Sequence, residues 1–148
     1  MSHELVNLRA QLAAPNVRTL IDHLEYPSDS REIKTNCVLA DYQCDVSLQL
    51  FGLMDSEALL GLIGLAPLDT QAASIRHIAV HRSRRKQGLG RAMIDLIFST
   101  LNLVRLEAET DDDAIGFYRR CGFAIENLGE QYPGIIRYRC RKDNVSQT

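Results

Sequence analysis

The sequence predicts a single α+β domain, in which helices are layered on a mixed central β-sheet in an α/β/α arrangement. Its 148 residues, 45% of them hydrophobic, suit one domain with a proper core. Segments with the apolar spacing of helices alternate with segments that have the period of strands. No linker, repeat or low-complexity stretch divides residues 1–148, so we expect one domain over the whole chain.

The N-terminal part predicts two helices, preceded by a segment that the pattern leaves open. Residues 5–9 fit either a first strand or the start of a helix face that continues to Leu12. Apolar residues at helical spacing from Val17 to Leu24 predict a helix that ends near Pro27. Ser30 is a suitable N-cap for a second helix that carries Ile33, Cys37 and Ala40.

The remaining pattern predicts strands and helices in alternation. The expected strands cover Val46–Met54, Ala58–Leu65, Ser74–Val80, Val104–Glu109, Phe123–Leu128 and Ile135–Arg141, and the expected helices begin at Leu89 and span Asp112–Arg120. The apolar stretch from Leu48 to Leu65 contains Asp55 and Glu57, and Asp55-Ser56 has the composition of a turn. A hairpin therefore explains this stretch better than a membrane span.

A basic loop with two glycines joins the strand that ends at Val80 to the helix that starts at Leu89. The N-terminus of a helix offers unpaired N–H groups and a partial positive charge, which together bind anions. Gly88 and Gly90 lack a Cβ and allow the backbone to approach an anion closely. Charged donors are added by Arg84, Arg85, Lys86 and Arg91. The junction is thus a candidate receptor for a diphosphate.

The spacing Arg85-x-x-Gly88-x-Gly90 matches neither the dinucleotide pattern nor the P-loop. It resembles the coenzyme A pyrophosphate loop of the GNAT superfamily, the Gcn5-related N-acetyltransferases. A second segment, from Glu107 to Phe123, resembles the acceptor-side motif of the same family. Its matching residues are Ala114, Phe117, Tyr118, Gly122 and Phe123, whereas Asp111 replaces the usual asparagine. Together the resemblance covers roughly residues 46–140.

The second segment also has a local physical interpretation. Thr110 followed by Asp113 approximates a capping box, and acidic residues suit the positive end of the helix dipole. Arg119 and Arg120 suit the negative end, and Gly122 is a plausible residue for terminating the helix.

The resemblance implies a GNAT acyl-CoA N-acyltransferase fold with a splayed pair of parallel strands, here Ile75–Val80 and Val104–Glu109. It implies transfer of an acetyl group from acetyl-CoA, the cosubstrate, to an amine. Backbone groups of Ile78, Ala79 and Val80 would hydrogen-bond the pantetheine arm in the manner of a neighbouring strand. The implied cofactor-binding residues are Ile78, Ala79, Val80, Arg85, Lys86, Gln87, Gly88, Leu89, Gly90, Arg91, Asp111, Ala114, Phe117 and Tyr118.

Direct transfer needs an acid for the departing thiolate and a route for the proton of the amine. Tyr118 stands where many relatives have the acid, and a phenol with a pKa of about 10 suits that role. The base is open, because Ser74 stands where some relatives have glutamate. Glu107 is our candidate, and Glu109 and His77 are alternatives, as is a water chain to bulk solvent.

Composition excludes several other classes. The net charge of −2 gives no general attraction to nucleic acid or membranes. The four cysteines form no C-x-x-C pair, and no signal peptide is evident, so we expect free, mostly buried thiols in the cytoplasm. The histidines and cysteines are not spaced as a zinc site, and we expect no metal.

Two questions stay open from the sequence. One alternative to an enzyme is a non-catalytic module that binds acyl-CoA and acts as a sensor or regulator. The acceptor, a small-molecule or peptide amine, is not identified, although Tyr26, Tyr132 and the segment from Gly129 to Gly134 are candidates for lining its pocket. Dimers are common among GNAT proteins, so a homodimer is compatible with this interpretation.

Overall fold

The computed structural model describes residues 3–22, 31–56 and 58–144. Its centre is a seven-stranded sheet with the order β1-β2-β3-β4-β5-β7-β6, in which the pair β4–β5 is parallel and every other neighbouring pair is antiparallel. The strands are β1 (Glu4–Asn7), β2 (Gln49–Asp55), β3 (Ala58–Asp69), β4 (Ala72–Val80), β5 (Arg105–Thr110), β6 (Ala124–Tyr132) and β7 (Ile135–Asp143). The mixed sheet predicted from the sequence is confirmed.

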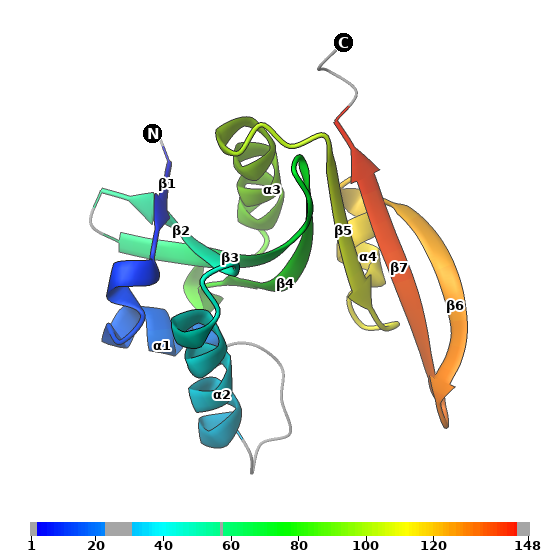
Figure 1. Ribbon diagram of the computed structural model, residues 1–148, viewed down its shortest axis with the longest axis horizontal. Helices are drawn as coiled ribbons and strands as arrows, with labels where there is room; N and C mark the ends of the chain where they lie inside the picture. Colours follow the sequence, from blue (N-terminus) through cyan, green and yellow to red (C-terminus); the bar gives the residue numbers. More distant parts are fainter. Residues whose placement is uncertain (1–2, 23–30, 57, 145–148) are drawn as a thin grey trace.

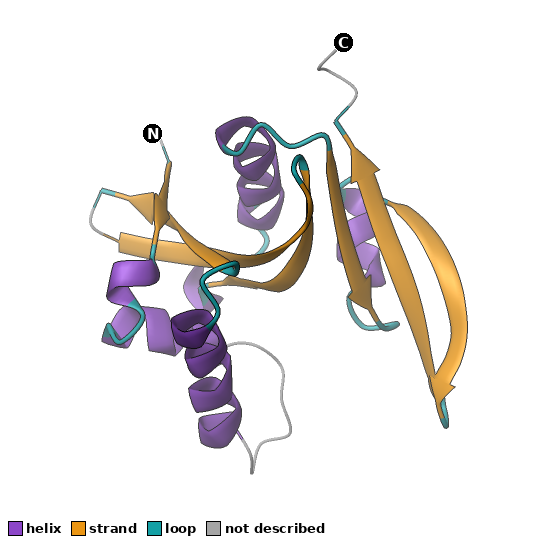
Figure 2. Ribbon diagram, in the orientation of Figure 1, coloured by secondary structure: helices purple, strands orange, loops and turns teal. Residues whose placement is uncertain are grey.

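Helices cover both faces of the first half of the sheet. Two of them, α1 (Pro15–Asp22) and α2 (Arg31–Cys44), lie below β2, β3 and β4 in Figure 1, and α3 (Leu89–Thr100) lies above them. The short helix α4 (Ile115–Arg120) packs behind β7 and β6. Figure 2 shows the resulting layers of helix, strand and helix. This is the α+β arrangement that the alternating pattern predicts.

Two apolar clusters fill these layers, one on each face of the sheet. Successive residues of β3 point to opposite faces, so that Leu62 joins the cluster beside α1 and α2 whereas Ile63 joins the cluster beside α3. Both side chains are completely buried. Strand β3 is hydrophobic on both sides because helices cover both of its faces, which explains the uninterrupted apolar run that the sequence shows there.

The N-terminal segment that the sequence left open is a strand. Glu4–Asn7 pairs antiparallel with β2, and Val6 lies opposite Gly52. A short 3-10 turn, Arg9–Gln11, follows this strand. Arg9 then holds the end of α2, because its guanidinium donates hydrogen bonds to the carbonyl oxygens of Tyr42, Asp45 and Leu48. These oxygens lie at or just beyond the helix C-terminus, where carbonyl groups lack intrahelical partners.

A bulge in β4 changes which face its residues occupy. Ile75 lies opposite Leu65, but His77 lies opposite the adjacent residue Gly64, so Arg76 is an extra residue in the ladder. Ile75 packs beside α3, whereas His77 contacts Tyr42 of α2 on the other face. Without the bulge, residues two apart would share one face.

Strands β4 and β5 pair over three positions only. Ala72, Ala73 and Ser74 lie beside Arg105, Leu106 and Glu107, and no pairing continues beyond them. The two strands then separate, and Figure 1 shows β5 and β7 diverging from β4. The splayed parallel pair implied by the family resemblance is therefore present, and it starts directly after Ser74 and Glu107.

Local boundaries differ from the sequence prediction near α4. The helix begins at Ile115 rather than Asp112, and Asp111, not Thr110, caps the preceding turn by accepting a hydrogen bond from the N–H of Asp113 at 3.0 Å. Thr110 is instead the last residue of β5. The capping-box interpretation of Thr110 is therefore wrong, because β5 continues one residue further than its apolar pattern indicates.

Other expectations are corrected or lie outside the described residues. Most of the segment 129–134 belongs to β6, which ends at Tyr132, rather than to a loop. Cys121 and Cys140 are buried, but Cys37 and Cys44 are exposed on α2. The expected helix positions Leu24, Pro27 and Ser30, together with Tyr26, fall in the range that the structure does not describe. Across the described ranges, every helix is too short or too polar to cross a membrane.

Candidate active site

A depression of about 520 Å³ lies where β4 and β5 separate, on the side of α3 and α4. It is lined by Ile78, Ala79, Val80, Arg85, Gly90, Thr110, Asp111, Asp113, Ala114, Phe117 and Tyr118. Nine of these eleven residues were predicted from the sequence to bind a cofactor, and Thr110 and Asp113 were not. We call this depression the cofactor cleft. The two motifs, which are separated in the sequence, form opposite walls of it.

The glycine loop ends in a left-handed residue that starts α3. Gly88 is the N-cap of the helix, with φ of 76°, and a Cβ built there would meet nothing within 4 Å. Space is therefore free above the N-terminus of α3, where the first N–H groups have no intrahelical partner. Such a terminus is an anion-binding position. Lys86 also has a positive φ of 65°, so the loop turns sharply before the helix.

Gly90 is required for a different reason from the one the sequence suggested. A Cβ at this position would lie 2.7 Å from the ring of Phe117, which packs across from α4. The missing side chain allows α3 and α4 to approach each other. The close approach at Gly90 is therefore between α3 and α4 rather than between the backbone and an anion. It fixes the position of α4 at the cofactor cleft.

Not every predicted loop residue lines the cleft. Leu89 points into the core and is 5% exposed. Lys86, Gln87, Gly88 and Arg91 are exposed at the rim beyond the cleft lining. The Nη1 atom of Arg91 donates to the carbonyl oxygen of Arg120 at 3.3 Å, which ties α3 to the end of α4. An extended phosphate group above Gly88 would still lie within reach of this basic rim.

Tyr118 lies at the base of the cleft and is 6% exposed. Its ring makes edge-on contacts with Phe117 and Phe123, which fix its orientation. Among the described residues, its hydroxyl has no hydrogen-bond partner, so the O–H group is available to a ligand in the cleft. Burial raises the pKa of the Tyr118 phenol above its ordinary value, so the group stays protonated at physiological pH.

The acidic residues before α4 have separate structural roles. Asp111 accepts the hydrogen bond from Asp113 described above, and Asp112 accepts one from the hydroxyl of Tyr138 at 2.6 Å. This second bond ties the start of α4 to β7. It also raises the pKa of the Tyr138 phenol. The carboxylates therefore fix the cleft wall, and Asp111 and Asp113 also line it.

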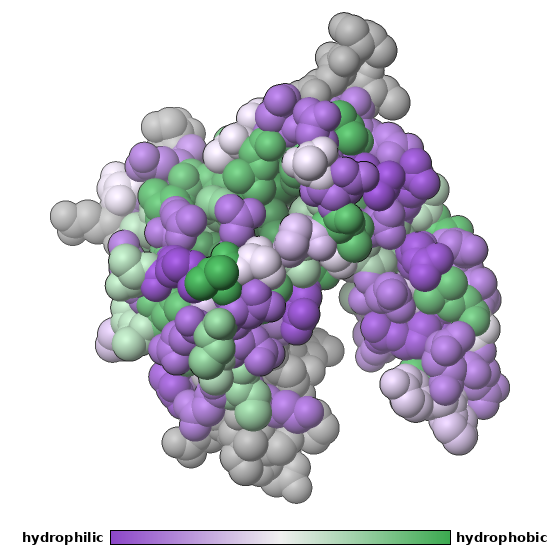
Figure 3. Space-filling model, viewed as in Figure 1, coloured by the Kyte–Doolittle hydropathy of each residue, from purple (hydrophilic) through white to green (hydrophobic). Residues whose placement is uncertain are grey.

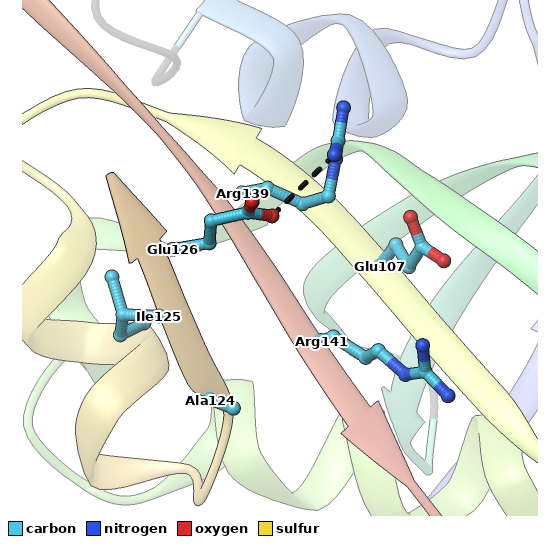
Figure 4. A pocket seen from close by; sticks show the side chains of 6 residues that line it. All are labelled: Glu107, Ala124, Ile125, Glu126, Arg139 and Arg141. Carbon is cyan, nitrogen blue, oxygen red and sulfur yellow. Dashed lines mark hydrogen bonds and ion pairs between the residues drawn. The ribbon is translucent and has the colours of Figure 1, made fainter. Parts of the chain in front are cut away.

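Glu107 lies on the opposite face of β5 from the cofactor cleft. Its Oε2 atom is 2.9 Å from Nε of Arg105, close enough for an ion pair but without the alignment of a hydrogen bond. It lines a depression of about 360 Å³ with Ala124, Ile125, Glu126, Arg139 and Arg141 (Figure 4). Ser74 is its direct neighbour across the parallel pair.

A second depression of about 620 Å³ adjoins it on the same face. It is lined by Glu109, Leu128, Gln131, Tyr132, Arg137 and Arg139. We call it the outer depression. Tyr132 and Glu109 were sequence candidates, but Arg137 and Arg139 were missed, because alternating arginines on an edge hairpin resemble an ordinary solvated face. Figure 3 shows mainly hydrophilic side chains over β7 and β6, and a hollow between this part and the rest of the molecule.

His77 is half-buried and belongs to a polar pair between β4 and α2. Its Nδ1 atom lies 2.8 Å from the hydroxyl oxygen of Tyr42, and the two rings meet edge to face. Burial, with a smaller contribution from the nearby Arg76, lowers the pKa of His77 to about 4. His77 is therefore neutral at pH 7. It lines none of the depressions described above.

Within the described residues, no three histidine, cysteine or acidic side chains gather as a metal site would need. The architecture is that of an acetyltransferase fold, with a splayed parallel pair, a glycine loop at a helix N-terminus and a tyrosine between them.

The chain belongs to the GNAT acetyltransferase family, because the model of the acetyltransferase (GNAT) domain matches residues 47–125. It is 31% identical over 68 residues to an uncharacterized N-acetyltransferase from Bacillus methanolicus. That alignment covers 46% of this chain and 57% of the relative, so the match spans little more than half of the relative's length.

Solved structures share the fold over nearly the whole chain. A GNAT-family protein from Desulfovibrio desulfuricans has a TM-score of 0.76 at 18% identity, with 96% of this chain and 99% of that chain covered. A chimera of the spermidine N-acetyltransferase SpeG from Vibrio cholerae has a TM-score of 0.70 at 20% identity, covering 97% and 96%. At this level of identity the likeness defines the fold alone.

Proposed function

We propose that the protein is an acetyl-CoA-dependent N-acetyltransferase that acts on a primary amine by direct transfer. The observation that carries this proposal is the cofactor cleft, in which the phosphate-binding type of loop and Tyr118 lie on one continuous surface. Acetyl-CoA would supply an acetyl group activated as a thioester. The reaction would form an amide bond to the amine nitrogen while the carbon–sulfur bond breaks.

The residues of the cleft suit the different parts of this cosubstrate. Beyond Ser74 the edge of β4 is not paired to β5, so backbone groups of Ile78, Ala79 and Val80 are offered to an extended ligand. The N-terminus of α3 and the side chains of Arg85 and Arg91 would hold the diphosphate. Ala114 and Phe117 give the cleft its apolar wall.

Tyr118 would act on the departing sulfur. Its raised pKa makes it a weaker acid than a phenol in water, so a hydrogen bond to sulfur is favoured over early proton release. The thiolate would form in the same apolar surroundings, and burial raises the pKa of that group too. The two changes partly cancel, so proton donation by Tyr118 late in carbon–sulfur cleavage remains consistent with the site.

Glu107 is our candidate to receive the proton of the amine, directly or through water. It stands where β4 and β5 begin to separate, on the face opposite Tyr118, so an amine entering the gap from that side would meet it. Arg105 lies 2.9 Å from the carboxylate and holds it in place at this position. Glu109 lies two residues further along the same face, where the strands are already apart.

The alternative function is a module that binds acyl-CoA without turnover. The observation that favours it is the ion pair of Glu107 with Arg105, since this carboxylate is already engaged by a neighbouring guanidinium. Both functions use the same cleft. They differ in whether an amine increases the release of free thiol from acetyl-CoA.

Calorimetric titration with acetyl-CoA, with ATP and NAD as controls, tests the shared part of the proposal. We expect saturable binding of acetyl-CoA alone, followed by amine-dependent thiol release in a coupled assay. Binding without thiol release from a broad amine panel would support the module instead. An absence of acetyl-CoA binding would overturn both.

The exposed thiols of Cys37 and Cys44 suit a reducing compartment such as the cytoplasm, which is the location we propose.

A further inference from the structure

The face of the sheet opposite the cofactor cleft holds two side chains of opposite charge that form no ion pair with any described residue. Glu109 of β5 and Arg137 of β7 both line the outer depression. Neither side chain makes a hydrogen bond or an ion pair with another described residue. The other charged residues near them are paired, since Arg139 lies 3.5 Å from Glu126 and Arg141 lies 3.2 Å from Asp143.

The ladder explains why Arg137 has no partner. Arg139 lies opposite Glu126 on β6 and opposite Glu109 on β5, so acidic residues flank it on both sides. Arg137 lies opposite Gly129, which has no side chain, and β5 ends before reaching it. It is half-buried even so. Arg137 thus lines the outer depression without an acidic residue opposite it on β5 or β6.

Glu109 and Arg137 are diagonal neighbours across the β5–β7 pair, because Glu109 lies opposite Arg139, two residues from Arg137. Diagonal residues on one face of a sheet are about 7–8 Å apart at the backbone, within reach of long side chains. A small molecule with adjacent positive and negative groups could bridge the two. Leu128 and Tyr132 would add an apolar wall for the rest of that molecule.

The outer depression and the cofactor cleft lie on opposite faces of β5. Glu109 lines the outer depression and the next residue, Thr110, lines the cofactor cleft. Successive side chains of a strand point to opposite faces, so the two sites lie back to back on β5. At Glu109, two residues beyond the last paired position of β5, β4 no longer pairs with β5. An ammonium group held by Glu109 would therefore lie beside the opening between the strands.

We infer that the acceptor is a zwitterion, an α-amino acid or a close analogue, with its amine beside Glu109 and its carboxylate bound by Arg137. The guanidinium group offers paired donors that match a carboxylate. A polyamine has no anionic group for Arg137 and would bring further positive charge beside it, so a polycation does not complement this depression. This inference rests on the proposed transferase function and adds the class of acceptor to it.

The test compares L-amino acids with their amides and with spermidine as acceptors, by thiol release from acetyl-CoA. An amide keeps the side chain and the amine but lacks the carboxylate, and its amine loses a proton more easily. Greater activity with the acid form must therefore come from recognition of the carboxylate. We expect at least one amino acid to exceed its amide about tenfold in kcat/KM, equivalent to about 1.4 kcal/mol.

Arg137→Gln should remove this preference by raising KM for the amino acid, with little effect on the amide. Arg18→Gln is the matched control, because Arg18 is an equally half-buried arginine on α1 that donates to Asn36 instead. Calorimetry of both variants with acetyl-CoA shows whether the cofactor cleft is intact. If spermidine or the amides are the better acceptors, or Arg137→Gln leaves the preference unchanged, the inference is wrong while the transferase function stands.

A binding measurement separates failure of the inference from failure of the proposed function. The same amino acids and amides are titrated into the protein saturated with CoA, which cannot react. Binding of an amino acid that Arg137→Gln abolishes supports the zwitterion site even without turnover. Equal binding of acid and amide, or no binding of either together with no turnover, overturns it. If acetyl-CoA itself does not bind, the proposed function has failed first.

Discussion

The ring of Phe117 occupies the place that a Cβ on residue 90 would need, with only 2.7 Å between them. Gly90 comes from the first turn of α3 and Phe117 from α4, so this contact brings the two motifs together at the cofactor cleft. It makes the position of α4 dependent on the absence of a side chain in α3. Tyr118, the next residue, is held in the cofactor cleft by the same helix.

Gly90→Ala should therefore destabilise the fold. Overpacking costs about 1–3 kcal/mol, whereas alanine gains up to about 1 kcal/mol over glycine in a helix. We expect a net loss of about 1–2 kcal/mol in the free energy of unfolding, measured in urea. Gly116→Ala is the control, since a Cβ there meets only the mobile guanidinium of Arg120 at 3.3 Å. Phe117→Leu combined with Gly90→Ala should recover part of the loss, and strict additivity would contradict the contact.

Gly88→Glu should weaken acetyl-CoA binding about tenfold or more, or about 1.4 kcal/mol, because it places a negative charge at the N-terminus of α3. Titration calorimetry measures the effect. Gly134→Glu provides the control, because Gly134 also has a positive φ, 79°, and open space around it but lies at the β6–β7 turn. Both variants carry the same backbone strain. Equal affinity of the two variants for acetyl-CoA would mean that the diphosphate does not bind at the N-terminus of α3.

Tyr118→Phe should lower kcat by about 10²–10⁴-fold, the usual contribution of an acid catalyst, and leave the Kd for acetyl-CoA nearly unchanged. The substitution removes only the hydroxyl, and the ring contacts with Phe117 and Phe123 remain. A loss of kcat can therefore be assigned to the hydroxyl. Thiol-release kinetics and calorimetry measure the two quantities. Tyr138→Phe, which removes a hydroxyl bound to Asp112 but leaves the Tyr118 hydroxyl in place, should lower turnover far less. Wild-type turnover in Tyr118→Phe would exclude the acid role.

The neutral His77 predicts a loss of stability in mild acid. Its pKa is about 4 in the folded protein against 6.5 as the ordinary value, so the unfolded chain binds the extra proton between these limits. The contribution of neutral His77 to the free energy of unfolding is fully present above pH 6.5. It falls as the pH drops toward 4, and below that pH it changes little further. The total loss is about 3 kcal/mol.

Urea unfolding from pH 4 to pH 8 measures this change. His77→Gln should flatten the dependence across that window, whereas His81→Gln should keep it because His77 is still present. The same slope in wild type and His77→Gln would show that other groups cause the acid sensitivity.

The sequence by itself determined the elements that depend on local pattern. The sequence predicted a helix from Leu89, and α3 begins there, because a helix N-terminus is set by adjacent residues. The spacing of Ala114, Phe117 and Tyr118 likewise placed one face of α4 along the cleft. Alternation in the later segments gave the strands and the mixed sheet.

Only the tertiary structure decided which distant residues meet. The extra residue at Arg76 turns His77 toward Tyr42, and no local pattern shows a bulge that depends on pairing with β3. Glu107 and Glu109 appear equivalent in the sequence, yet Glu107 pairs with Arg105 whereas Glu109 has no ion pair among the described residues and lines the outer depression. Strand register sets these neighbours, and it is fixed by packing across the whole sheet rather than by the residues of one segment.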